Sequence, residues 1–96
     1  PPPKKSGLDY EGLRSLANEA IEGLQGETPE EINALTGKSM LFKMGKTEIP
    51  FTTDTFMLSF SLPNFYFHAT TTYAVLREHG VPLGKMDYLG QLRVNL

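Results

Sequence analysis

The segment from Phe56 to Leu76 constrains the fold of this chain more than any other part of the sequence. At about 100° per residue, apolar side chains cover about two thirds of the circumference of a helix over this segment. A helix that rests against a single neighbour needs an apolar stripe of only ~100°. The chain has 96 residues and offers one further long helix and a hairpin. We therefore expect a second chain, or helices from a missing N-terminal half, to cover part of this helix.

A polar stripe lies inside the same apolar arc. With His68 placed at zero on the helical wheel, Ser61, Asn64 and Thr72 fall within about 40° of it, and Thr71 lies just outside. Buried polar groups cost several kcal/mol unless they are paired. The stripe therefore predicts either an internal hydrogen-bond network or the wall of a pocket, and the sequence leaves both readings open.

His68 is the candidate functional residue of this stripe. Imidazole titrates near neutral pH and is a common metal ligand, so His68 can act as a ligand or as a general acid or base. The alternative is a core histidine that hydrogen-bonds Asn64, Thr72 or a backbone carbonyl. Thr71 and Thr72 have a local alternative as well, because helical threonines often bond the carbonyl four residues back.

Two helices are predicted in the first third of the chain. Asp9 is a suitable N-cap for a helix from Tyr10 to about Leu24, whose apolar residues recur at helical spacing, and Gly26 predicts an αL-type end. The apolar set is Leu13, Leu16, Ala17, Ala20, Ile21 and Leu24. The segment 28–31 has the pattern of a capping box and predicts a second, short helix that stops at the Thr36-Gly37 pair.

A β-hairpin and a long helix are predicted in the middle of the chain. A hairpin is predicted from Ser39 to Phe51 with Gly45 at the turn, since Met40, Phe42 and Met44 alternate with Leu41 and Lys43. Ile49 and Phe51 continue the apolar set on the return strand. Thr53 or Asp54 then caps a helix from about Thr55 to Glu78. A two-stranded hairpin alone is marginally stable, so we expect it to pack on a helix.

A proline and a glycine predict a kink within this long helix and the position of its end. Pro63 lies inside it, so we expect the helix to continue on both sides with a kink. Gly80 ends the helix, and residues 81–96 form a tail with turns at Gly84 and Gly90.

Composition excludes several classes of function. A net charge of −2 offers no basic face for nucleic acid. The absence of cysteine excludes disulfides and thiolate chemistry from this chain and favours a cytoplasmic protein. No apolar run approaches the ~20 residues that span a membrane. The length allows at most one domain.

Two segments resemble a family of unknown function related to the DinB/YfiT-like helical bundles. The first is the run Phe56–Tyr73, whose most specific part is the motif Leu62–Tyr73, and the second is the run Arg77–Gly90. The resemblance covers the chain from its proline-rich start to residue 90. It implies that residues 1–90 are the C-terminal half of a DinB-like four-helix bundle, mostly α, and that 91–96 are a tail.

The resemblance also implies a site and a mode of assembly. Many DinB-like relatives form homodimers and bind a divalent metal through three histidines, two of them spaced His-x-x-x-His on the last helix, and some are thiol-dependent transferases. It implies His68 as a ligand for a metal such as zinc or nickel. In this chain the positions four residues either side of His68 are Asn64 and Thr72.

Two hypotheses of function remain open at this point. The first is a metal-dependent or acid/base group-transfer enzyme with His68 in an interior pocket lined by Ser61, Asn64, Thr71 and Thr72. The alternative is a non-catalytic module for small-ligand binding or dimerisation. No phosphate-binding glycine loop, nucleophile elbow or paired-carboxylate motif occurs to favour a particular reaction.

Overall fold

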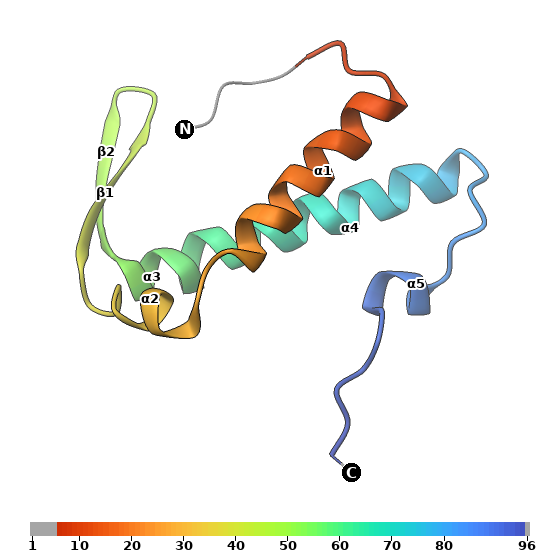
Figure 1. The fold of residues 1–96 in the computed structure, drawn as a ribbon. Coiled ribbons are helices and arrows are strands. Elements are labelled where there is room, and N and C mark those ends of the chain that lie inside the picture. The colour runs from red at the N-terminus through yellow and green to blue at the C-terminus, as the bar shows by residue number, and fades with distance from the viewer. Residues whose placement is uncertain (1–5, 96) are drawn as a thin grey trace. The chain divides into compact units, whose positions relative to one another are not determined.

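The computed structural model describes residues 6–95, which divide into two compact units. The first unit is residues 1–36 and the second is residues 37–96, and each is described by itself. Figure 1 traces the elements: α1 (Tyr10–Gln25), α2 (Pro29–Asn33), β1 (Ser39–Met44), β2 (Thr47–Thr52), α3 (Thr53–Phe56), the π-helix η1 (Met57–Ser61), α4 (Leu62–Glu78) and α5 (Lys85–Leu89). The mostly helical architecture with one hairpin confirms that part of the predicted fold.

The first unit holds α1 and α2, and its helix starts are as the sequence predicts. Asp9 caps α1, since its Oδ1 accepts the N–H of Gly12 at 2.8 Å. Thr28 and Glu31 form the capping box of α2: the Thr28 hydroxyl accepts from the Glu31 N–H at 3.2 Å, and the Glu31 carboxylate accepts from the Thr28 N–H at 2.9 Å. These reciprocal bonds satisfy N–H groups that a helix start leaves without partners.

The predicted αL end of α1 at Gly26 is wrong. The helix does end at Gln25, but Gly26 has φ −74° and ψ −14°, which are right-handed values. Its N–H still donates to the Glu22 carbonyl at 3.1 Å, so the last turn closes without a left-handed residue. The second helix is short as predicted, but it ends at Asn33, before the Thr36-Gly37 pair that was expected to stop it.

The second unit begins with the predicted antiparallel hairpin. Met44 pairs with Thr47, which leaves Gly45 and Lys46 as the loop. Gly45 has φ +62°, whereas no residue other than glycine has a positive φ in the described part of the chain. Glycine at the first loop position and an ordinary residue at the second define a type II′ turn, which matches the twist of the strands.

One face of the hairpin packs on the start of the long helix. Met40 and Phe42 on β1 alternate with exposed neighbours and pair with Phe51 and Ile49 on β2. The ring centroid of Phe42 lies 5.3 Å from that of Phe56 and 4.6 Å from that of Phe60. The Phe51 and Phe56 rings are 5.5 Å apart. This half-buried aromatic cluster is the main tertiary packing of the second unit.

The long helix starts slightly earlier than predicted. Thr52 is its N-cap, with its hydroxyl accepting from the Thr55 N–H at 3.2 Å. Asp54 does not cap the helix; its Oδ2 accepts the N–H of Gly37 at 2.7 Å. The Thr53 N–H donates to the Lys38 carbonyl at 2.8 Å. Both bonds join the start of the hairpin to the start of the helix, a long-range role that local capping rules do not foresee.

The helix continues past Pro63 as predicted, with a π turn just before the proline; the expected kink stays a prediction. Residues Met57–Ser61 are π-helical, and the Leu62 N–H donates to the Met57 carbonyl five residues back. Pro63 is the second residue of α4. Its missing N–H and its ring therefore fall where the i−4 ladder of bonds is already interrupted. The ribbon runs from α3 through α4 without a loop (Figure 1).

The segment after α4 is more structured than a tail. The helix ends at Glu78, and Gly80 follows with φ +89°, as predicted. A short helix, α5, then forms over Lys85–Leu89, where only turns were expected. The Asp87 Oδ2 accepts the Gly84 N–H at 2.7 Å and holds its first turn. A Gly-x-x-Asp spacing was the available signal for this helix start.

No residue of the described chain, 6–95, is buried. Large apolar side chains stay exposed on both long helices, for example Leu24 at 76% on α1 and Phe67 at 65% on α4. None of the helices in this part has the length and apolar character that a membrane-spanning segment needs. Apolar surface on this scale indicates association with a partner or oligomer.

The aromatic cluster generates a stability prediction. Phe42→Ala removes a ring that contacts Phe56 and Phe60, whereas Leu41→Ala alters the exposed face of the same strand. We expect Phe42→Ala to reduce the protection of the hairpin amides by about 1–3 kcal/mol, below the cost at a fully buried site. Native-state hydrogen exchange measures it. Equal losses in the two variants would show that the cluster does not hold the hairpin to the helix.

Candidate functional site

His68 lies in the middle of α4 and is exposed in this chain. Its ring meets the edge of the Phe67 ring, with centroids 5.3 Å apart and planes at 82°. The Thr72 hydroxyl donates to the His68 backbone carbonyl at 2.8 Å. Within residues 6–95 the imidazole itself makes no hydrogen bond. The structure thus joins Thr72 to the backbone of His68 and leaves both ring nitrogens free for a group outside this part of the chain.

The neighbouring polar residues are satisfied locally or face solvent. Thr71 donates to the Phe67 carbonyl at 2.8 Å, which repeats the i−4 pattern of Thr72 and confirms the local alternative for both threonines. Asn64 is exposed, and its amide has no hydrogen bond in the described residues. The side chains of Asn64, Thr71 and Thr72 are therefore not joined to the His68 ring by hydrogen bonds here.

Ser61 lies at the junction of the π turn and α4. It is the last residue of the π turn and is half-buried. A π turn holds more residues than an α turn because its hydrogen bonds span five residues. The α-helical angle therefore applies from Leu62 to Glu78 and does not extend across residues 57–61. Ser59, in the same turn, donates its hydroxyl to the Thr55 carbonyl.

The described residues 6–95 contain no group of three or more His, Cys, Asp or Glu side chains that could hold a metal ion. His79, the other histidine, sits at the end of α4, where its Nδ1 donates to the Val75 carbonyl at 2.8 Å. The donor set on these residues does not fit the three-histidine centre that the resemblance implies. A metal at His68 stays a prediction that needs ligands from elsewhere.

A groove lies where α5 meets α4, and sequence reasoning assigned it no role. The Tyr88 hydroxyl is 3.2 Å from the Thr70 hydroxyl, and the Tyr88 ring is 5.8 Å from that of Tyr73. These contacts hold α5 against α4. The groove beside them has a volume of about 480 Å³ and is lined by Phe65, Tyr66, Ala69, Asp87, Tyr88 and Leu89. Its only sequence signal is the Asp-Tyr pair in the segment that resembles the DinB-related family.

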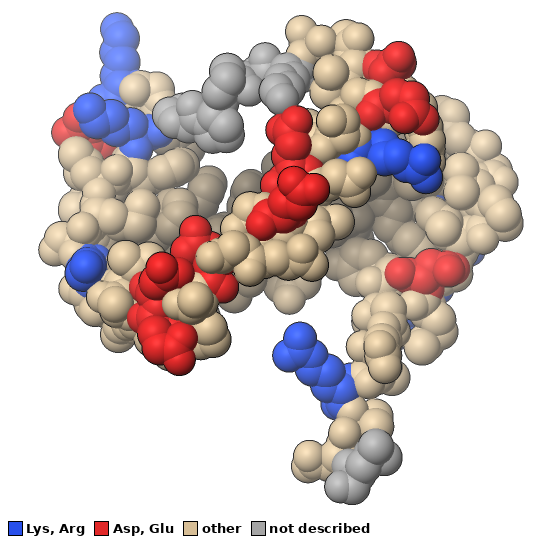
Figure 2. Space-filling view, viewed as in Figure 1, with Lys and Arg blue, Asp and Glu red and all other residues tan. Residues whose placement is uncertain are grey.

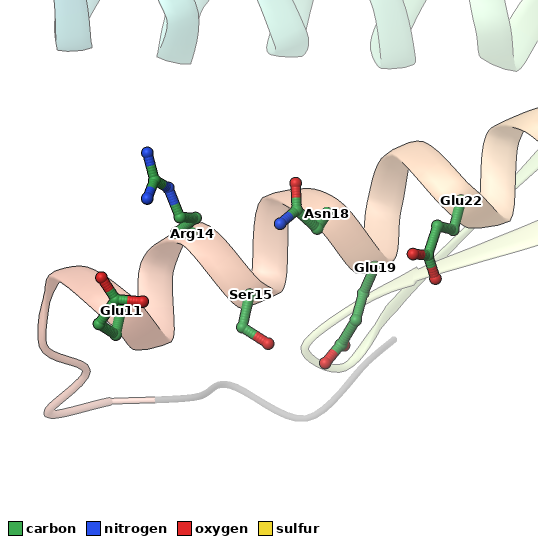
Figure 3. A pocket seen from close by; sticks show the side chains of 6 residues that line it. All are labelled: Glu11, Arg14, Ser15, Asn18, Glu19 and Glu22. Atoms are coloured by element: carbon green, nitrogen blue, oxygen red, sulfur yellow. The ribbon is translucent and has the colours of Figure 1, made fainter.

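Other surface features of the described chain are less suited to binding a ligand. A shallow depression of about 330 Å³ on α1 is lined by Glu11, Arg14, Ser15, Asn18, Glu19 and Glu22. Figure 3 shows these side chains spread along one helix without converging on a common point. In the view of Figure 2, acidic side chains follow α1 and α2, and basic side chains lie in small separate groups. None of the residues predicted for a pocket lines the depression on α1.

Comparison with known proteins places the chain in a family. The model of a domain of unknown function, DUF1993, matches residues 2–89, and the chain belongs to that family. No curated protein and no solved structure was found to match it. The family match confirms the expected membership of a family of unknown function. It does not extend to the DinB/YfiT-like bundles, so that relation stays a prediction.

Tyr88 generates a prediction about the docking of α5. Tyr88→Phe removes the hydroxyl bonded to Thr70 and keeps the ring against Tyr73, so we expect a loss of at most about 1 kcal/mol. Tyr88→Ala removes both contacts and should speed exchange of the Gly90 amide, which donates to the Met86 carbonyl at the end of α5. Hydrogen exchange by NMR measures both, with Tyr10→Ala as the control. Identical exchange in the Ala variant and the native chain would contradict this anchoring role.

Proposed function

We propose that this chain is a self-association module in which a second copy covers the apolar faces of its long helices. Residues 1–90 then act as half of a four-helix bundle. The observation that carries the proposal is the exposure of large apolar side chains around His68 on α4, such as Phe67 at 65% and Val75 at 48%. Such surface leaves water only when another apolar surface packs against it.

The lengths of the helices favour a second copy as the partner. Helix α1 has 16 residues and α4 has 17, and both carry uncovered apolar side chains. A four-helix bundle packs four such helices around a core of apolar positions. Two copies of this chain supply four long helices, so a dimer is the smallest assembly that meets that number. The resemblance to bundles that often form homodimers supports the same choice.

The assembled bundle gives the polar stripe a role. Packing against the face of His68 would enclose the residues predicted for the pocket: Ser61, Asn64, His68, Thr71 and Thr72. The hydroxyls of Thr71 and Thr72 already donate hydrogen bonds to backbone carbonyls. The imidazole of His68 and the amide of Asn64 then remain to bind a polar group of a small ligand.

The unpaired imidazole favours a second candidate function, acid/base group transfer. Within residues 6–95, neither ring nitrogen of His68 is engaged in a hydrogen bond, whereas the His79 Nδ1 bonds the Val75 carbonyl. A histidine with a free ring nitrogen can act as a general acid or base. In this candidate the enclosed His68 moves a proton on a bound substrate, and the dimer excludes water from it.

The dimer is tested by a pair of variants matched in charge. Val75→Asp and Arg77→Gln each lower the net charge by one, but only Val75 lies on the wheel beside His68. A carboxylate buried in an apolar interface is costly, so we expect Val75→Asp to weaken dimerisation at least about tenfold, roughly 1.4 kcal/mol. Arg77→Gln should leave it within about threefold. Sedimentation equilibrium measures both.

Two results would contradict self-association. One is a native chain that sediments as a monomer at concentrations up to about 1 mM, which corresponds to an association free energy weaker than about −4.1 kcal/mol. The other is equal weakening by both variants, which would place the interface away from the face of His68.

A separate variant distinguishes a functional from a structural His68. Since its ring makes no hydrogen bond within the described residues, His68→Ala should change the free energy of unfolding by less than about 1 kcal/mol. Asn64→Ala on the same face is the comparison, and urea unfolding at fixed protein concentration is the measurement. A loss above about 2 kcal/mol for His68→Ala alone would identify a core histidine and reject acid/base chemistry as its role.

A further inference from the structure

The groove between α4 and α5 is formed within one unit of the chain and does not depend on self-association. Its volume of about 480 Å³ falls in the range of small-molecule sites. Phe65 and Ala69 lie one helical turn apart, and the small half-buried Ala69 leaves room between the bulkier side chains. The residues Asp87, Tyr88 and Leu89 supply the α5 side.

The lining combines aromatic rings with a single charged group. Phe65, Tyr66 and Tyr88 contribute three rings, and Asp87 is the one ionisable acid or base among the lining residues apart from the two phenols. Asp87 Oδ2 accepts the Gly84 N–H at 2.7 Å. Its other oxygen, Oδ1, has no hydrogen bond within the described residues. A carboxylate oxygen is thus available beside aromatic side chains.

Two contacts of Tyr88 join the α5 side of the groove to α4. Tyr88 is held by the 3.2 Å contact with the Thr70 hydroxyl and by the Tyr73 ring. Asp87 is held by its bond to the first turn of α5.

We propose that this groove binds a small organic cation that carries a methylated ammonium group. The faces of aromatic rings are negative and attract such a group when it lies within about 6 Å of the ring centroid. The methyl groups contact Phe65, Tyr66 and Leu89, and the charge is balanced by Asp87. A neutral ligand of the same shape would gain the apolar contacts and neither of the electrostatic ones, so charge decides the occupant.

The test is an NMR titration of the full chain with choline chloride at constant ionic strength. The matched control ligand is 3,3-dimethyl-1-butanol, which replaces the ammonium nitrogen of choline with carbon. We expect saturable shifts at Tyr66, Ala69 and Tyr88 with choline, and binding at least about tenfold weaker with the neutral alcohol. The absence of saturable shifts, or equal binding of the two ligands, would overturn the proposal.

Variants test the two electrostatic contributions separately. Asp87→Asn keeps an oxygen that can accept from the Gly84 N–H but removes the charge, and should weaken choline binding at least about fivefold. Tyr66→Phe keeps an aromatic face and should bind choline within about twofold, whereas Tyr66→Leu should bind it several-fold more weakly. Glu48→Gln, on the hairpin and paired with Lys43 at 3.3 Å, is the charge control and should have no effect.

Three outcomes decide against the site or its stated ligand. If Asp87→Asn binds choline with unchanged affinity, the carboxylate does not contribute to binding and the proposal is overturned. If Glu48→Gln weakens choline binding as much as Asp87→Asn does, the effect comes from net charge alone, and the proposal is overturned as well. Tighter binding of a trimethyl-lysine peptide than of choline would replace the small molecule with a protein ligand. If Tyr66→Leu loses its helical circular dichroism, the Tyr66→Phe and Asp87→Asn results still decide.

Discussion

The apolar surface of α4 exceeds what the described chain places against it, and the other features of the second unit depend on this excess. The hairpin packs on Phe56 of α3 and Phe60 of η1, which precede α4. Tyr88 packs on Tyr73 nearer the other end. Between them Phe67 is 65% exposed. The chain therefore presents an incomplete core, and association is the physical route by which such a surface leaves water.

Features set by neighbours in sequence were predictable. The Asp9 cap, the Thr28 capping box, the Gly45 turn and the Gly80 helix end each depend on a few adjacent residues, and the structure has all of them. The hairpin itself followed from the alternation around Phe42. Local hydrogen bonding and backbone preference determine these elements without help from tertiary packing.

Features set by distant contacts were not predictable. Asp54 bonds Gly37, 17 residues away, instead of capping its own helix. The π turn before Pro63 was not foreseen, because the wheel assumes one uniform helix. Of the candidate site, the back-bonded threonines were foreseen, but Asp87 and Tyr88 were left without a role because their groove needs α5 to dock on α4.

The dependence of unfolding on protein concentration tests the central claim most directly. If a second copy covers α4, folding and association are linked, and the midpoint of thermal unfolding rises with chain concentration. We expect a clear rise over about a hundredfold range, equivalent to ~2.7 kcal/mol of added stabilisation at the upper end for tight association. A cooperative transition whose midpoint stays the same across that range would contradict the account, because it would show that the chain completes its core alone.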